Sequence, residues 1–307
     1  MESVSSTPAR AQRTFRKRWL HEQTRWGYLC LLPTLIFLGV FVVFPVLFAL
    51  YLSFTSWDMV SPVKPWVGLD NYRNLFQDHD FILALENTAY FSAGLIVLTV
   101  VCSLSLALLL NRTWRGVAFF RALYYTPSIV SIVAISAIWL WLYEPTYGLL
   151  NAVLGIFGAS PVQWLGDPNW AMPSVIIMTV WKNAGYYMVI YLAGLNGIPK
   201  ILYEAASIDG ATGLQRFRHI TWPLLMPVTM FVVVLSIINS FQVFGQIYVM
   251  TSGGPVKSTL VIAYYLYLQA FSFFHMGYAS AIAYVLFAVI FVLTLIQMKL
   301  LGPRTTY

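Results

Sequence analysis

Residues 199–227 read PKILYEAASIDGATGLQRFRHITWPLLMP, a short stretch of mixed polarity between two long apolar runs. Pro199 suits the first turn of a helix, because proline lacks only an N–H that would be unpaired there. Gly210 suits the position just past a helix end, where a positive φ is needed. A second short helix can run from Leu214 to about Thr221, before the next apolar run begins. The stretch therefore predicts two short helices joined at a glycine.

The first of these predicted helices has one apolar face. Ile201, Leu202, Ala205 and Ile208 recur at spacings of three and four residues, which places them on the same side of a helix. We therefore expect the helix–glycine–helix element to lie against a membrane.

Ten residues of this stretch have a spacing that resembles the "EAA" loop of ABC importer permeases. More narrowly, they resemble the maltose/glycerol-3-phosphate type of carbohydrate permease, in which an aspartate commonly precedes the glycine. Trp222 departs from the pattern, since the family usually has leucine there, but the change affects only the bulk in an apolar position. So many matches within 24 residues make the resemblance specific. The matching residues are Glu204, Ala205, Ala206, Asp209, Gly210, Ala211, Phe217, Ile220, Pro223 and Pro227.

The resemblance implies that the loop docks, as a coupling helix, into a cleft on a separate ATPase subunit. In that interpretation the small alanines permit close approach, Gly210 sets the bend, and Glu204 offers a charge to a basic partner. The residues alone leave open an ordinary interfacial amphipathic loop. The predicted coupling residues are Glu204, Ala205, Ala206, Asp209, Gly210, Ala211 and Phe217.

The composition is typical of a polytopic membrane protein. Of the 307 residues, 59% are hydrophobic and 9% are charged, whereas soluble domains carry about 25% charged residues. The net charge of +7 is concentrated before Gly27, which is typical of a cytoplasmic end beside a span and does not indicate nucleic acid. Cys30 and Cys102 lie inside apolar runs, and their spacing predicts neither a metal site nor a disulfide.

Six segments are long and apolar enough to cross a bilayer, which takes about 20 residues. They are roughly Gly27–Phe54, Ala84–Leu110, Leu123–Tyr143, Ser174–Leu195, Leu224–Met250 and Met276–Leu300.

The distribution of lysine and arginine predicts the orientation of these spans. With the N-terminus inside, the cytoplasmic segments hold 14 Lys/Arg and the outer segments hold three, Lys64, Arg73 and Lys257. This asymmetry follows the positive-inside rule. It predicts cytoplasmic N- and C-termini and a cytoplasmic Glu204 loop, independently of the resemblance.

The sequence contains no nucleotide-binding signature. The glycine-rich run 253–259 lacks a glycine immediately before Lys257 and so fails the phosphate-loop spacing. No catalytic arrangement or metal spacing is visible, so we expect neither a catalytic nor a metal site. ATP and Mg²⁺ would then be bound by a partner ATPase, and this chain would bind no cofactor.

Polar residues in the fifth predicted span form a stripe, since Ser236, Asn239, Gln242 and Gln246 recur at steps of three, three and four. An aromatic stripe of Phe241, Phe244 and Tyr248 runs beside it. Amides can hydrogen-bond sugar hydroxyls, and aromatic rings can cover the apolar face of a pyranose, so the pair suits a carbohydrate path. The alternative is that these side chains only hold neighbouring helices together.

The fourth predicted span contains a second set of candidates, Lys182, Asn183 and Tyr186. Lys182 is the one basic residue well inside a span, and such charges are functional candidates by default. Its ammonium can bind a hydroxyl or a phosphate, or its long stem can carry it to the outer interface.

These observations predict an all-α polytopic membrane protein with six transmembrane helices and a cytoplasmic coupling loop, about residues 198–222, between the fourth and fifth. Residues 1–26 form a basic cytoplasmic segment, 27–302 the permease domain and 303–307 a cytoplasmic tail. The resemblance implies a subunit of a binding-protein-dependent importer in a bacterial or archaeal inner membrane, surrounded by lipid. Its implied partners are a second, related permease, two ATPase subunits and an extracytoplasmic solute-binding protein.

The expected solute is a disaccharide or oligosaccharide, and glycerol 3-phosphate or a glycerophosphodiester is the alternative that Lys182 favours. An ion-coupled secondary transporter is a further rival, but it predicts acidic groups within spans. Only Glu86 and Glu144, near span ends, could serve that purpose.

Overall fold

The computed structural model describes residues 26–112 and 114–301, which form two units, divided after Leu52. The first unit contributes one apolar helix, the candidate span Trp26–Ser53, which contains the π-helical turn η1 (Gly39–Val43) and α2 (Phe44–Ser53). The predicted basic segment before residue 26 and the predicted tail from residue 303 lie outside the described residues.

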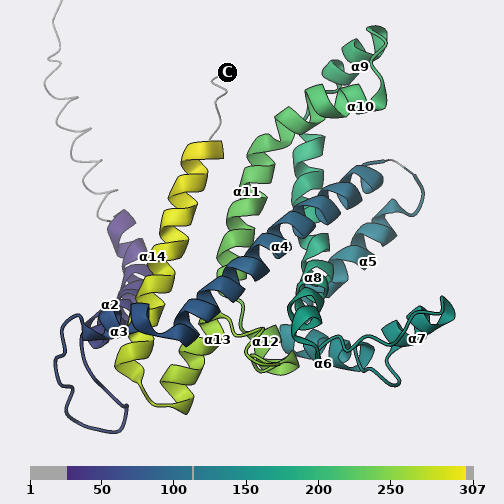
Figure 1. Ribbon diagram of the computed structural model, residues 1–307. Helices are drawn as coiled ribbons and strands as arrows, with labels where there is room; N and C mark the ends of the chain where they lie inside the picture. The colour runs from purple at the N-terminus through teal and green to yellow at the C-terminus, as the bar shows by residue number, and fades with distance from the viewer. Residues whose placement is uncertain (1–25, 113, 302–307) are drawn as a thin grey trace, which may run out of the picture. The chain divides into compact units, whose positions relative to one another are not determined.

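In the described part of the second unit the regular secondary structure is helical, apart from one isolated antiparallel bridge between Thr55 and Trp66 (Figure 1). Its elements, in chain order, are α3 (Asp70–Gln77), α4 (His79–Leu110), α5 (Val117–Ile129), α6 (Ile132–Leu142), α7 (Leu149–Ile156), α8 (Pro168–Asn196), α9 (Lys200–Ile208), α10 (Gly213–Arg216), η2 (Phe217–Thr221), α11 (Trp222–Phe241), α12 (Gly245–Met250), α13 (Ile262–Tyr267), η3 (Leu268–Ser272) and α14 (Met276–Leu301).

The all-α membrane fold predicted from composition is confirmed. Within the described residues, five helices are long and apolar enough to cross a membrane, and a bent pair makes a sixth span if its two halves are counted together. The count of six spans therefore stays a prediction that depends on the bent pair.

The bent pair corrects the expectation of one helix over Leu123–Tyr143. α5 and α6 meet at an angle of 101°, with the break at Val130 and Ser131. Pro127 lies within the last turn of α5 and cannot donate a backbone hydrogen bond. Beyond the break, α6 packs against α12, where Ile132 meets Gly245.

The expected fifth span, Leu224–Met250, is wrong at its C-terminal end. The helix that begins at Gly213 ends at Phe241, and three residues separate it from α12. A Cβ on Gly245 would lie 2.9 Å from Cγ2 of Ile132, so the first residue of α12 lies closely against α6. α12 therefore packs against α6 and is a helix separate from α11.

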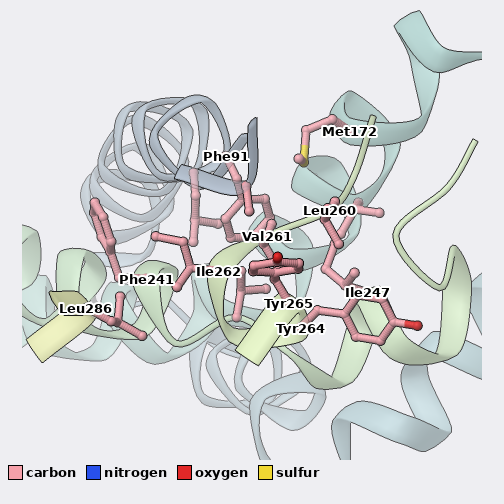
Figure 2. Packing of buried hydrophobic residues seen from close by; sticks show 14 of the residues in the cluster. Phe91, Met172, Phe241, Ile247, Leu260, Val261, Ile262, Tyr264, Tyr265 and Leu286 are labelled. Carbon is pink, nitrogen blue, oxygen red and sulfur yellow. The ribbon is translucent and has the colours of Figure 1, made fainter. Parts of the chain in front are cut away.

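Two of the three clusters of buried apolar side chains in the described residues hold α8 in place within the second unit. Figure 2 shows the larger one, in which the segment 260–262 is surrounded by residues of α4, α8, α11, α12, α13 and α14, including Phe91, Met172 and Leu286. The other cluster packs α8 against α4 and α11, with Tyr191 and Leu225 fully buried. Between them, the two clusters fix α8 against α4 and α11.

Among the glycines of the described residues, Gly185 of α8 lies in the tightest contact with another helix. A Cβ built on Gly185 would lie 1.8 Å from the backbone oxygen of Tyr124 in α5. Because backbone cannot move aside as a flexible side chain can, no side chain at position 185 fits without shifting one of the helices.

We predict that Gly185→Ala destabilises the protein by about 1–3 kcal/mol, the typical cost of overpacking a tight contact. Thermal unfolding of the detergent-purified protein measures the change. Gly155→Ala is the matched control, since Gly155 lies in α7 and has nothing within 4 Å of an added Cβ. The control should be neutral or gain about 0.5–1 kcal/mol from helix propensity. Equal unfolding temperatures for the two variants would contradict the close contact.

Candidate functional site

The end of α9 has the backbone geometry expected of a helix terminated by glycine. Gly210 has φ +75°, which confirms the prediction that this position needs a left-handed conformation. Its N–H donates to Ser207 O at 3.2 Å, and the N–H of Ala211 donates to Ala206 O at 2.8 Å. These two bonds make a Schellman motif, which satisfies the carbonyls at the helix end and reverses the chain.

The start of α10 is also stabilised by hydrogen bonds, as the end of α9 is. Thr212 and Gln215 form a capping box, in which the Thr212 N–H donates to Gln215 Oε1 at 2.7 Å. Two side-chain bonds then tie α9 to α10 and to the following π-helical turn η2. Arg216 donates to Ser207 Oγ at 3.0 Å, and the hydroxyls of Tyr203 and Thr221 lie 2.9 Å apart. The loop is therefore a defined hairpin of helices.

The surface of this hairpin is apolar and exposed. Ile208 is 87% exposed, Leu214 76% and Ile201 69%, although isoleucine and leucine are normally buried. Glu204 is exposed as well. A cavity of about 390 Å³ lies between the helices and is lined by Asp209, Gly210, His219 and neighbouring residues. Figure 1 places α9 and α10 beyond the ends of α8 and α11, at the opposite end from α12 and α13.

The hairpin continues into the bundle without a break. Residues 213–241 run helically from α10 through the π-helical turn η2 into α11, so the short second helix predicted over 214–221 is part of one longer helix. Phe217 is half-buried and packs against the Trp222 ring at 6.3 Å. A single π-helical turn inside an α-helix is common at functional sites.

The four residues of the predicted polar stripe do not lie on one helix, which corrects that expectation. Ser236 and Asn239 belong to α11, Gln242 lies in the break, and Gln246 belongs to α12. The break turns their side chains to different surroundings. Gln242 lines an apolar cavity of about 370 Å³ with residues of α13 and α14, while Asn239 and Gln246 turn to α8.

Residues of α8, α11 and α12 instead form a polar seam, which we define as Thr179, Asn183, Tyr187, Asn239 and Gln246. Asn239 Nδ2 donates to the Tyr187 hydroxyl at 3.1 Å, and Gln246 Nε2 donates to Thr179 Oγ1 at 3.4 Å. Asn183 lies one turn from each of these α8 partners and has no hydrogen-bond partner in the described part of the chain. The seam therefore contains two amides that make hydrogen bonds, those of Asn239 and Gln246, and one without a partner among the described residues, that of Asn183.

Sequence reasoning missed Thr179 and Tyr187 as members of this seam. Their spacing with Asn183, at steps of four, was a usable signal, because residues four apart share one face of a helix.

The predicted aromatic stripe divides as well. Phe241 is buried at 6% exposure in the larger apolar cluster. Phe244 and Tyr248 stack with ring centroids 5.5 Å apart, and both contact Tyr267 of α13. Tyr248 remains 47% exposed. The structure thus brings two of the three aromatic rings to a cluster between α12 and α13.

Lys182 lies at the bend between α5 and α6. Its ammonium donates to the backbone oxygen of Ser128 at 3.1 Å, in the last turn of α5. A cation at a helix C-terminus is favourable, because the unpaired carbonyls there carry partial negative charge. Tyr186, predicted alongside it, is 41% exposed with its ring against Tyr187.

These features describe a class of protein: a helical membrane permease with an exposed hairpin at one end and a polar seam within its spans. Residues 99–307 match the family of binding-protein-dependent transport system inner membrane components, and the chain belongs to that family. Members are subunits of ABC importers, transport components rather than enzymes, and reside in the inner membrane.

Curated relatives and a solved structure resemble the chain over nearly its whole length. A trehalose/maltose transport system permease protein of Thermococcus litoralis is 36% identical over 282 residues, covering 91% of this chain and 94% of the relative. An sn-glycerol-3-phosphate transport system permease protein of Agrobacterium fabrum is 35% identical over 287 residues, covering 91% and 96%.

The solved structure is a bacterial ABC transporter that imports the acidic polysaccharide alginate. One of its chains superposes with a TM-score of 0.80 at 27% identity, covering 97% of this chain and 100% of that one. A second crystal structure shows the alginate transporter with an alginate pentasaccharide-bound periplasmic protein, again at a TM-score of 0.80 and 26% identity, covering 96% and 99%.

We predict that the Asn239–Tyr187 bond contributes about 0.6 kcal/mol to helix association, the average for such bonds within membranes. A double-mutant cycle with Asn239→Leu and Tyr187→Phe, measured by reversible unfolding in detergent micelles, gives the coupling energy. Additive effects of the two substitutions would contradict the bond. Uptake measured on the same variants separates the two roles, because an amide that contacts solute makes Asn239→Leu more damaging than Tyr187→Phe at equal stability.

Proposed function

We propose that this chain is one of two permease subunits of an ATP-driven importer for a disaccharide or short oligosaccharide. The observation that carries the proposal is the continuous helix from the exposed hairpin to the polar seam. Asn239 lies near the end of that helix, 26 residues after Gly213, so displacement of the hairpin moves a seam residue.

The carbohydrate class is supported by the names of the relatives and by exposed polar and aromatic residues at and near the seam. The Thermococcus relative transports trehalose and maltose, and the structural neighbour imports alginate. Asn239 and Gln242 are exposed amides at the end of a membrane helix, and polar groups in spans generally face a cavity or the interior of the assembly. Tyr248 and Tyr186 are exposed aromatic side chains on the adjoining helices.

Glycerol 3-phosphate is the second candidate, because a relative of similar identity transports it. The residue expected to favour an anion, Lys182, directs its ammonium at the Ser128 carbonyl. That contact supports a role for the Lys182 charge at the α5 terminus, and we therefore favour a sugar as the solute.

The proposed assembly contains a second, related permease, two ATPase subunits that bind ATP and Mg²⁺, and an extracytoplasmic solute-binding protein. The bound periplasmic protein of the alginate transporter supports the last of these partners. The hairpin, including Glu204, Ala205, Ala206, Asp209 and Ala211, docks on an ATPase subunit in the cytoplasm. The exposed Ile208 and Leu214 supply its apolar contact. With the hairpin in the cytoplasm, this proposal puts α12, α13 and the start of α14 near the outer surface.

In this mechanism, closure of the ATPase pair on ATP displaces the docked hairpin, and residues 213–241 transmit the displacement. The bonds from Arg216 to Ser207 and from Tyr203 to Thr221 keep α9 moving with the longer helix. At the far end, the movement opens or closes the seam against α8. The chain itself binds no nucleotide in this scheme.

We predict that a neutral disaccharide, and not glycerol 3-phosphate, stimulates ATP hydrolysis by the complete complex. The complex is reconstituted in liposomes with its ATPase subunits, partner permease and binding protein, and each solute is tested at saturation. Replacing Leu214 with Glu should abolish the stimulation, because it places a charge in the apolar docking surface. Stimulation by glycerol 3-phosphate alone would overturn the solute assignment. A permease that recruits no ATPase would overturn the importer assembly.

We predict that Gly210→Val uncouples ATP hydrolysis from uptake while the chain still inserts in the membrane. A β-branched residue at φ +75° is strongly disfavoured, so the Schellman turn is lost. Gly213→Ala is the matched control, because Gly213 begins α10 without a positive φ and has open space around it. Uptake of labelled sugar by proteoliposomes should fall to background in the first variant and stay normal in the second. Normal uptake by Gly210→Val would show that the bend is dispensable.

A further inference from the structure

A polar cavity of about 660 Å³ lies at the end of the second unit opposite the coupling hairpin. Its walls come from the segment before α3, from α3 itself, from η3 and from the start of α14. Pockets for small ligands measure about 300–1,000 Å³, so the volume is sufficient for one. The polar seam contributes no residue to its lining.

The cavity lies outside the hydrocarbon layer. α4 has 32 residues, about 48 Å at 1.5 Å per residue, whereas the hydrocarbon core is about 30 Å thick. The helix is therefore several turns longer than the core, and charged groups near its start indicate that its first turns are the part that lies outside. Lys257 donates to both carboxylate oxygens of Asp80 at 2.7 Å there.

One wall of the cavity is preformed by a folded external segment. The Trp57 indole donates to Ser61 O at 2.9 Å, and Asp58 Oδ1 accepts from the Ser61 N–H at 2.7 Å. Asn71 of α3 donates to the backbone oxygens of Ser53 and Thr55 at 2.8 and 2.9 Å. These bonds hold the segment without any ligand.

Asp78 fixes the opposite wall. Its carboxylate accepts hydrogen bonds from the hydroxyls of Tyr265 and Tyr278, the latter at 2.6 Å. Gln269 continues the network by donating to the Tyr265 hydroxyl at 2.7 Å. Burial raises the pKa of Asp78, but hydrogen bonds from the two tyrosines and two backbone N–H groups outweigh burial, so the pKa lies below its ordinary value. The cavity therefore holds a fixed negative charge at neutral pH.

The remaining lining combines free polar groups with aromatic rings. Asn74 is exposed and has no hydrogen-bond partner among the described residues. Phe273 and Phe274 are 54% and 49% exposed, although phenylalanine is usually buried. Amides bind hydroxyl groups, and exposed rings can cover the apolar C–H face of a sugar.

We propose that this cavity binds a glycosyl unit of an uncharged saccharide at the outer face of the permease, separately from the seam. The proposal rests on the orientation and the saccharide class of the proposed function. Asp58 and Asp78 oppose anionic solutes, and no lysine or arginine of the described chain lines the cavity. Lys64 lies nearby, over the Trp57 ring at 4.7 Å, but is not a lining residue. The site thus selects neutral sugars over uronates and sugar phosphates.

Protection of a cysteine at position 74 tests the proposal. Cys30 and Cys102 are first replaced by alanine, and Asn74→Cys is introduced into the full-length chain of the assembled complex. Right-side-out vesicles are treated with a membrane-impermeant maleimide in the presence of maltose, trehalose, galacturonate or glycerol 3-phosphate. A neutral sugar at ten times its half-protection concentration should slow labelling about tenfold, by occupancy. The two anions should leave the rate unchanged.

Two matched controls locate the protection. Arg73→Cys lies one residue earlier in α3, outside the lining, and should be labelled at the same rate with or without sugar. Phe273→Ala in the Asn74→Cys chain should remove the protection. Phe271→Ala, also at a position 54% exposed but not lining the cavity, should preserve it.

The outcomes separate the two proposals. Because Asn74 is itself one of the proposed contacts, Ser56→Cys, at an exposed lining position with no proposed contact, is labelled in parallel. Labelling of both cysteines from outside without protection by any neutral sugar overturns the saccharide site and leaves the proposed importer standing. Equal protection by galacturonate or glycerol 3-phosphate overturns the selectivity for neutral sugars. Labelling only after the membrane is permeabilised overturns the orientation on which the proposed function depends.

Discussion

The structure depends on satisfying the backbone groups at helix ends, a requirement that is severe where water is scarce. Several helix ends have a partner of their own. One of the last carbonyls of α5, that of Ser128, accepts from the Lys182 ammonium, and the last carbonyl of α4, that of Leu110, accepts from the Arg121 guanidinium at 2.7 Å. α9 ends in the Schellman turn at Gly210, and α4 begins with the Asp78 carboxylate accepting from the Asp80 N–H at 2.9 Å. Because the breaks are stabilised in this way, the permease can contain bent and discontinuous helices.

These stabilised breaks leave residues 213–241 as the one described element that connects the hairpin to the region of the seam without interruption. Motion applied at the hairpin has a direct mechanical route along that helix. The route passes the π-helical turn at 217–221, where Phe217 packs against Trp222. The far end carries Asn239, whose amide contacts α8. In the proposed mechanism, the uninterrupted helix 213–241 therefore carries the motion from the hairpin to the seam, and the breaks lie in other helices.

The sequence was sufficient to predict the helical membrane class, the approximate spans and the glycine-terminated hairpin, because those follow from apolar length and from local backbone chemistry. It could not locate the bend between α5 and α6 or the end of α11 at Phe241. Both depend on tertiary contacts, such as Ile132 against Gly245, that hydropathy does not encode. The same limit applies to the polar residues of the fifth predicted span. Their types and spacing were visible, but the division of Asn239, Gln242 and Gln246 among different neighbours follows from the break in the helix.

The most direct test of the central claim is a pair of spin-label distances in the reconstituted complex, measured with and without trapped ATP. Labels at Gly213 and Phe231 lie on the continuous helix, about 27 Å apart at 1.5 Å per residue, and a label at Ile177 lies on α8. All three positions are exposed. We expect the 213–231 distance to stay constant while the 177–231 distance changes on ATP binding. A change confined to the 213–231 distance would show that the π-helical turn bends instead of transmitting the motion, which contradicts the account.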